Sequence, residues 1–198
     1  MRIILIRHGQ TDENKQKRYI GHYDSPLNDT GKQQVKGLAE RLKKFDVRGN
    51  CYSSDLLRTV ETSEIICNTF SLDLKVTPDL REIHFGDWEC HTYDELHEKN
   101  PEDLHRWISN PHLYSPPNGE TLTELGSRVD RWVEKIIFSK SEEDCLIVCH
   151  GGPIRWILSK WVLRDEAQFW NVQNISHGEG LMLDVDVARN IWKIKGNI

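Results

Sequence analysis

Two short, unbroken runs of apolar residues stand out from the mixed pattern of the rest of the chain. The first covers residues 3–6 and the second covers residues 145–149. Runs without polar alternation are typical of strands that are buried on both faces, as in the parallel sheets of α/β proteins. We therefore predict two central strands, one at the start of the chain and one late in it.

Other segments have the 3.6-residue periodicity of helices. Thr30 and Gln33 have the spacing of a capping box ahead of a helix that continues to about residue 45, and Thr121 and Glu124 have it ahead of a longer helix. The remaining predicted elements are strands at 51–53 and 74–77, a helix capped by Ser54 or Asp55, a helix over 154–162 behind Pro153, and a hairpin at 181–187 and 191–194. Strands that alternate with helices predict a three-layer α/β/α sandwich, with a mostly parallel sheet and an antiparallel edge.

The segment from residue 81 to about 120 differs from the rest of the chain in its composition. Aromatic, histidine and charged residues mix there with prolines, so the predicted helices are short. We interpret this segment as a small helical cap over the sheet, within a single domain that covers residues 1–198.

Composition narrows the class of protein. The chain has 198 residues and a net charge of −5, so nothing suggests a nucleic-acid binder held by a general basic surface. No stretch approaches the roughly 20 apolar residues that span a membrane, and the N-terminus does not resemble a signal peptide, so we expect a cytoplasmic protein. Five cysteines without a CxxC pair indicate neither a disulfide framework nor a zinc site.

Each of the two core strands delivers a histidine at its carboxyl end. Arg7, His8 and Gly9 follow the first strand, and His150 with Gly151 follows the second. If the strands are adjacent they lie ~5 Å apart, and ligands of open α/β sheets bind at this edge. Arg58, early in the helix after the strand at 51–53, can face the same edge, and guanidinium groups fit a phosphoryl dianion well.

The motifs resemble those of the histidine phosphatase superfamily, the phosphoglycerate-mutase-like proteins. They are LIRHGQT at 5–11, then Asn14, Arg18 and Gly21, DSPL at 24–27, SSDLLRT at 53–59, LREIHFGDWE at 80–89 and VCHGG at 148–152. They occur in the family's order and span most of the chain.

The resemblance implies a role for each matching residue. His8 would be the nucleophile that forms a phosphohistidine, and Glu82 would be the proton donor. The phosphoryl oxygens would be held by Arg7, Arg58 and His150, with a hydrogen bond from Asn14 and a backbone contact at Gly21. Arg18 and Gly151 are expected beside the substrate.

This chemistry explains the residue types. A neutral imidazole can attack phosphorus, whereas an imidazolium has no free lone pair, and neighbouring arginines disfavour protonation of His8. A phosphate dianion favours the neutral form of the Glu82 carboxyl group, which can then protonate the leaving oxygen. Since Arg7, Arg58 and His150 supply positive charge, we expect no metal and no cofactor.

The family contains phosphatases, mutases and members that mainly bind or signal. The chain goes from Glu89 almost directly to Tyr93 and lacks the insertion of the mutases, which favours hydrolysis of a small phosphorylated metabolite. The compact pattern resembles α-ribazole phosphatases of cobalamin biosynthesis and broad-specificity phosphatases of the same size. Mutase activity, or a non-catalytic phosphate-binding regulator, remains an alternative.

Less specific features have simpler interpretations. The substrate's exit path is expected to be lined by Arg18, His22, Tyr23, His84, Trp88 and Tyr93. The histidines of the cap lack metal-ligand spacing. Cys149, Trp132 and Trp156 are assigned to the core, and a homodimer through exposed strand or helix surface is compatible with the fold.

Overall fold

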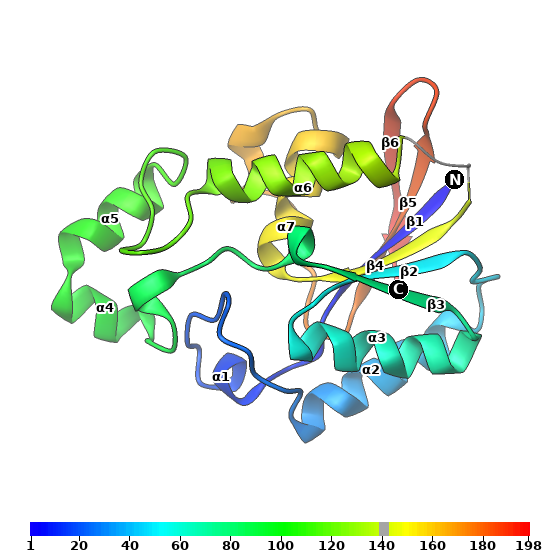
Figure 1. Cartoon of the computed structure of the whole chain (residues 1–198), viewed down its shortest axis with the longest axis horizontal. Coiled ribbons are helices and arrows are strands. Elements are labelled where there is room, and N and C mark those ends of the chain that lie inside the picture. Colours follow the sequence, from blue (N-terminus) through cyan, green and yellow to red (C-terminus); the bar gives the residue numbers. More distant parts are fainter. Residues whose placement is uncertain (139–142) are drawn as a thin grey trace.

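A six-stranded mixed sheet forms the centre of the molecule. The computed structural model describes residues 1–138 and 143–198, and Figure 1 shows its elements. The strands are β1 Arg2–Arg7, β2 Asn50–Ser54, β3 Asp73–Thr77, β4 Cys145–Cys149, β5 Gly180–Asp186 and β6 Ile191–Asn197. Their order is β3-β2-β4-β1-β5-β6, in which β3, β2, β4 and β1 are parallel and β5 and β6 form an antiparallel edge. The predicted mostly parallel sheet with an antiparallel edge is confirmed.

The two predicted core strands are neighbours in this sheet. Arg7 of β1 lies opposite Cys149 of β4, so both strands end at the same level. Every residue of β4 is buried, as is the centre of β1. This burial on both faces is the physical reason for the unbroken apolar runs.

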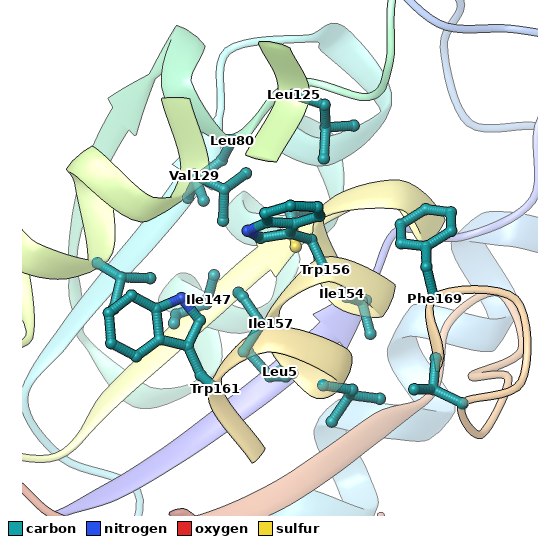
Figure 2. Close-up of a cluster of buried hydrophobic side chains, with 14 of the residues drawn as sticks. Leu5, Leu80, Leu125, Val129, Ile147, Ile154, Trp156, Ile157, Trp161 and Phe169 are labelled. Atoms are coloured by element: carbon teal, nitrogen blue, oxygen red, sulfur yellow. The ribbon is translucent and has the colours of Figure 1, made fainter. Parts of the chain in front are cut away.

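Helices cover both faces of the sheet (Figure 1). On one face lie α2 (Asp29–Leu42) and α3 (Leu57–Phe70), which pack on Ile4, Ile6 and Val148. On the other face lie α6 (Leu122–Ile136) and α7 (Gly151–Trp156), which continues as a π-helix over Ile157–Val162. Figure 2 shows the core on this second face, where Leu5 and Ile147 pack with Trp156. Trp132 also lies in this core, as predicted.

Short helices extend the molecule beyond one end of the sheet. They are α1 (Asp12–Lys15), α4 (Tyr93–Lys99) and α5 (Pro101–Ser109), with 3-10 turns at Pro78–Leu80, Gly86–Trp88 and Glu166–Gln168. Figure 1 shows α4 and α5 at the far end, away from β6. Leu96, Leu104 and Trp107 from these helices belong to the same buried cluster as Leu5. The predicted short helices over 81–120 are therefore confirmed.

Three predicted helix starts are wrong, and one is confirmed. Asn28, not Thr30, caps α2, because its side chain precedes the first turn and accepts from the Gly31 N–H at 2.8 Å. The helix at the end of β4 begins at Gly151 and not behind Pro153. Thr121 caps α6 and forms the predicted box with Glu124.

Neither Ser54 nor Asp55 caps α3. The helix starts after Leu56, which makes no side-chain cap. Asp55 instead accepts two hydrogen bonds from Arg81 at 2.7 Å, and Ser54 contacts His150. Both side chains are thus engaged at the edge of the sheet where the histidines lie.

Two further observations concern the whole described chain. None of the helices within residues 1–138 and 143–198 has the length and apolar character needed to cross a membrane. The five cysteines are all free thiols, and Cys149 is fully buried, as predicted.

Candidate active site

His8 and His150 meet at the carboxyl ends of β1 and β4. The centroids of their rings are 5.0 Å apart, and the residues are 3% and 0% exposed. The backbone N–H of His8 donates to the carbonyl of Cys149 at 3.1 Å, which continues the pairing of the strands. The predicted juxtaposition of the two imidazoles is present.

One hydrogen bond fixes the tautomer of His8. Its Nδ1 lies 2.7 Å from the carbonyl oxygen of Gly9, and because that oxygen can only accept, Nδ1 carries the proton. The lone pair is then on Nε2. Burial, followed by the charge of Arg58, lowers the pKa of His8 well below its usual value, so the ring is neutral at physiological pH.

His150 is also neutral in this environment. Burial first, then the charges of Arg58 and His8, lower its pKa well below the usual value. Its Nε2 is 3.0 Å from the hydroxyl oxygen of Ser54, whereas its Nδ1 is buried without a partner among the described residues. In the free protein burial thus disfavours the charged form of His150, and a positive charge on His150 beside a bound phosphoryl group stays a prediction.

Arg58 and Arg7 supply positive charge to the site from the interior. Arg58 is 0% exposed and donates to the carbonyls of Gly21 at 2.7 Å and Tyr23 at 2.8 Å. Burial lowers the pKa of Arg58 to about 10, so it remains a cation at neutral pH. Arg7 donates to the carbonyl of Ile175 at 2.9 Å. These contacts leave the Nε–H of each guanidinium group without a partner among the described residues.

Several buried nitrogen atoms next to His8 have no hydrogen-bond partner within the described residues. They are Nε of Arg7, Nε of Arg58, Nδ1 of His150 and Nε2 of His177. Unpaired buried donors are rare in folded proteins and call for an explanation. Two cations with unused donors around a neutral imidazole fit a bound oxyanion.

Glu82 lies near Arg7, against the start of α7. Its carboxylate accepts from the N–H of Gly152 at 3.0 Å and from the N–H of Ile83 at 2.9 Å. A Cβ atom at Gly152 would lie 2.1 Å from Oε1 of Glu82, so only glycine permits this approach. Gly151 lies beside Arg7 and Glu82, and its position next to the substrate site stays a proposal.

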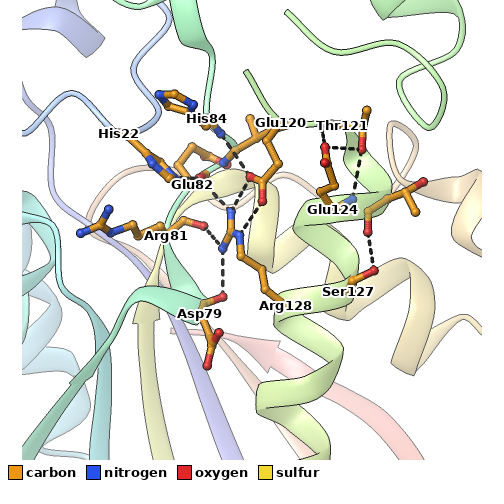
Figure 3. Close-up of polar contacts among 12 residues, drawn as sticks. His22, Asp79, Arg81, Glu82, His84, Glu120, Thr121, Glu124, Ser127 and Arg128 are labelled. Carbon is orange, nitrogen blue, oxygen red and sulfur yellow. Dashed lines mark hydrogen bonds and ion pairs between the residues drawn. The ribbon is translucent and has the colours of Figure 1, made fainter. Parts of the chain in front are cut away.

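Arg128 of α6 holds the segment that carries Glu82. Its guanidinium donates to the carbonyls of Asp79, Arg81 and Glu82 at 2.9, 2.6 and 2.9 Å (Figure 3). It also forms two hydrogen bonds with Glu120, at 2.8 and 2.9 Å. The position of Glu82 thus depends on a residue 46 positions away in sequence.

Other predicted site residues have structural partners. Asn14 forms a capping box with Thr11 at the start of α1. The N–H of Gly21 donates to Glu89 at 2.8 Å, so Gly21 reaches the site through its carbonyl, which accepts from Arg58. Arg18 is paired with Glu95. Phosphate contacts from Asn14, Gly21 and Arg18 stay predictions.

A cavity of about 190 Å³ opens next to Arg7 and Glu82. Its wall contains Tyr19, Phe85, Trp107, Phe169 and Trp170. None of the six residues that were predicted to line the exit path belongs to this wall, and Trp88 is 1% exposed and part of the core. The sequence gives no signal for the wall, because its aromatic residues come from distant segments.

Two residues closer to His8 were not predicted from the sequence. The ring of His177 lies 5.2 Å from that of His8, in an irregular segment without periodicity. Ser54 ends β2 and faces His150, and it could have been found by the same strand-end rule as the two histidines. Among the described residues, no group of three or more His, Cys, Asp or Glu side chains is arranged to hold a metal ion.

Comparison with known proteins places this geometry in a family. A family model described as "Histidine phosphatase superfamily (branch 1)" matches residues 3–193. The chain belongs to the histidine phosphatase superfamily. The resemblance found in the motifs is thereby confirmed.

Relatives in the histidine phosphatase superfamily agree with this assignment. The adenosylcobalamin/alpha-ribazole phosphatase of Salmonella typhimurium is 29% identical over 204 residues, which cover 98% of this chain and 99% of that one. The crystal structure of the alpha-ribazole phosphatase from Shigella flexneri superimposes with a TM-score of 0.89 at 26% identity, over 98% of this chain and 95% of that one.

Other relatives are longer than this chain. Phosphoglycerate mutase-like protein 4 of Arabidopsis thaliana is 37% identical over 155 residues, 77% of this chain and 67% of the relative. At 35% identity, the chain spans 43% of the length of mycobacterial relatives.

Proposed function

We propose that this protein hydrolyses phosphomonoesters of small metabolites through a phosphohistidine on His8, without a metal. The observation that carries the proposal is the neutral His8, with its Nδ1 proton fixed on Gly9, beside two arginines whose Nε donors are unpaired. A nucleophile with a free lone pair and an unfilled cationic clamp is the arrangement that phosphoryl transfer requires.

In the first step, Nε2 of His8 attacks phosphorus and the bond to the ester oxygen breaks. Arg7 and Arg58 hold the equatorial oxygens with the donors that are otherwise unused. The Ser54 hydroxyl donates a hydrogen bond to Nε2 of neutral His150, so the ring proton is on Nδ1, which can donate to another phosphoryl oxygen. Glu82 gives its proton to the leaving oxygen, and the alcohol departs.

In the second step, water attacks the phosphorus of the phosphohistidine. Glu82, now a carboxylate, takes a proton from the water as the P–N bond breaks. Inorganic phosphate leaves and neutral His8 is restored with Glu82 protonated, so the cycle is balanced. General acid catalysis supplies about 10²–10⁴-fold, so the arginine clamp and positioning must contribute most of the acceleration.

The short connection between Glu89 and α4 favours hydrolysis over a mutase. Only residues 90–92 separate Glu89 from Tyr93, which leaves no inserted segment at this point to retain a phosphorylated intermediate. α-Ribazole 5′-phosphate is the first substrate to test, because the match to the Salmonella enzyme covers nearly all of both chains. Mutase activity and phosphate binding without turnover are the alternatives.

The test measures release of inorganic phosphate from α-ribazole 5′-phosphate, phosphoserine, 3-phosphoglycerate and p-nitrophenyl phosphate. We expect turnover that survives a chelator and is lost in His8→Ala, whereas the exposed His105→Ala retains it. Turnover of α-ribazole 5′-phosphate far above the others identifies the substrate. Conversion of 3-phosphoglycerate to its isomer without phosphate release would show a mutase, and binding of phosphate without turnover of any ester would show a regulator.

A cytoplasmic location and a homodimer also belong to this proposal. Five free thiols suit a reducing compartment. The edge strand β6 exposes Ile191 and Ile194, which a second copy could cover. Fractionation of cells and light scattering on the purified protein test the two statements, and a monomer at all concentrations would reject the dimer.

A further inference from the structure

The cavity beside Glu82 has two chemically different ends. One end contains Arg7, Glu82 and the glycines of α7, which belong to the site of phosphoryl transfer. The other end is apolar and aromatic. A substrate whose phosphoryl group lies on His8 must direct its alcohol portion past Glu82, since Glu82 protonates the ester oxygen, and hence into this cavity.

The aromatic rings of the wall form a continuous series. The ring of Phe85 lies 4.9 Å from that of Tyr19 and 5.8 Å from that of Trp107. Trp107 and Trp170 meet edge to face at 5.7 Å, and Phe169 lies 4.9 Å from Trp170. A wall of this kind binds a flat ring by stacking and edge contacts.

The position of Trp170 within this wall is exceptional. Phe169, Trp107 and Phe85 are buried, but Trp170 is 47% exposed. It also lines a second apolar depression together with Trp107 and Ile108. Because Trp170 lines the cavity and is also accessible, its ring is available to a ligand that enters there.

Arg155 lines the cavity and is hydrogen-bonded to residues of the aromatic wall. Arg155 donates to the carbonyls of Phe169 and Trp170, both at 3.3 Å, and its other terminal nitrogen lies 3.5 Å from Oδ1 of Asn174. Arg155 follows Gly151 and Gly152 by one turn on α7, so it joins the aromatic wall to the element that holds Glu82.

We propose that the cavity is the subsite for the alcohol portion of the substrate, and that it selects phosphomonoesters whose alcohol carries a flat, uncharged ring. This inference rests on the proposed phosphatase function and names its substrate class. A volume of about 190 Å³ accommodates such a ring, since a cavity of about 150 Å³ holds benzene. Trp170 is the residue that determines this specificity.

The experiment compares benzyl phosphate with ethyl phosphate, two primary alkyl esters that differ in the ring. We expect kcat/KM for benzyl phosphate to exceed that for ethyl phosphate and for 3-phosphoglycerate by at least about 10-fold. Trp170→Ala lowers the ratio of benzyl to ethyl ester by roughly 3- to 10-fold, mainly through KM. Leu163→Ala, at an exposed position outside the cavity, leaves the ratio unchanged.

Two phosphonates that cannot be hydrolysed separate this inference from the proposed function. Benzylphosphonate binds more tightly than ethylphosphonate to the wild type, and Trp170→Ala reduces the difference. If this binding preference is found without turnover of any ester, the proposed subsite is supported and the proposed phosphatase function is refuted. Equal binding of the two phosphonates, a preference for 3-phosphoglycerate, or a ratio unaffected by Trp170→Ala overturns the inference.

Discussion

The guanidinium group of Arg128 donates a hydrogen bond to the main-chain carbonyl of Glu82 at 2.9 Å. The same guanidinium also donates to the carbonyls of Asp79 and Arg81, so α6 holds the segment that carries Glu82, the proposed proton donor. A residue outside the cavity thus sets the position of the carboxyl group that we propose as the proton donor to the leaving oxygen.

Arg128→Lys tests this positioning role. Lysine keeps a positive charge for Glu120 but cannot reach three carbonyls with one planar fork. We expect kcat to fall about 10- to 100-fold for alkyl phosphates, with KM little changed. Arg131→Lys is the matched control, because Arg131 lies on the same helix with a side chain that is 69% exposed. Equal kinetics of the two variants would refute the role of Arg128.

Glu82→Gln removes the proton donor while keeping an oxygen that can accept from Gly152. We expect kcat to fall by about 10²–10⁴-fold for alkyl esters, with inhibition by inorganic phosphate retained. The loss is smaller for p-nitrophenyl phosphate, whose leaving group needs no proton. Steady-state kinetics on both ester types measure this, and an equal loss of turnover and phosphate binding would mean that Glu82 has a structural role.

Gly152→Ala tests the close contact between α7 and Glu82. The added methyl group would lie 2.1 Å from Oε1 of Glu82, so the carboxylate must move and kcat falls by at least about 10-fold. Gly37→Ala is the control, since its methyl group would meet only the end of Arg41 at 3.6 Å. Because alanine favours helices over glycine, Gly37→Ala keeps activity and gains up to about 1 kcal/mol in the free energy of unfolding. Full activity of Gly152→Ala would contradict the geometry.

The buried histidines predict how stability depends on pH. The pKa values of His8 and His150 are well below the usual value in the folded chain, and burial lowers the pKa of His177 to about 3. Below about pH 6.5 the unfolded chain therefore binds more protons than the folded chain. The free energy of unfolding then falls with decreasing pH, by up to about 1.4 kcal/mol per pH unit for each histidine.

Urea unfolding of the wild type and of His177→Gln at about pH 7.5 and about pH 5 measures this dependence. The variant has one buried neutral histidine fewer, so its stability falls less between the two pH values. His105→Gln, at an exposed position, follows the wild type. An unchanged pH dependence in His177→Gln would show that His177 is not held neutral by burial.

The sequence predicted those parts of the fold and site that depend on a single strand and the residues directly after it. The apolar runs before His8 and His150 predicted two core strands, because such runs are typical of strands buried on both faces, and the strand-end rule predicted a shared edge for the two histidines if those strands were adjacent. The structure shows that they are adjacent. Helix starts failed where Ser54 and Asp55 are engaged by His150 and Arg81 instead of a helix terminus.

Residues that act through tertiary contacts were not predictable. Arg128 lies on an amphipathic helix, where an arginine is most often solvated. Its partners are main-chain carbonyls, which every residue has, so the amino-acid sequence does not indicate them. Trp107 and Trp170 meet across 63 positions of sequence, and only the folded chain shows that they share a wall. Local patterns record burial and periodicity, whereas such pairings depend on the packing of the whole chain.

The most direct test of the mechanism is to trap phosphorus on His8. A reaction with a ³²P-labelled ester is quenched rapidly at alkaline pH, where phosphohistidine persists, and the labelled peptide is sequenced. We predict stoichiometric label on His8 that is absent in His8→Ala and that accumulates in Glu82→Gln with p-nitrophenyl phosphate, because activation of water is impaired. Turnover at the normal rate without label on His8, or hydrolysis by His8→Ala, would contradict the account.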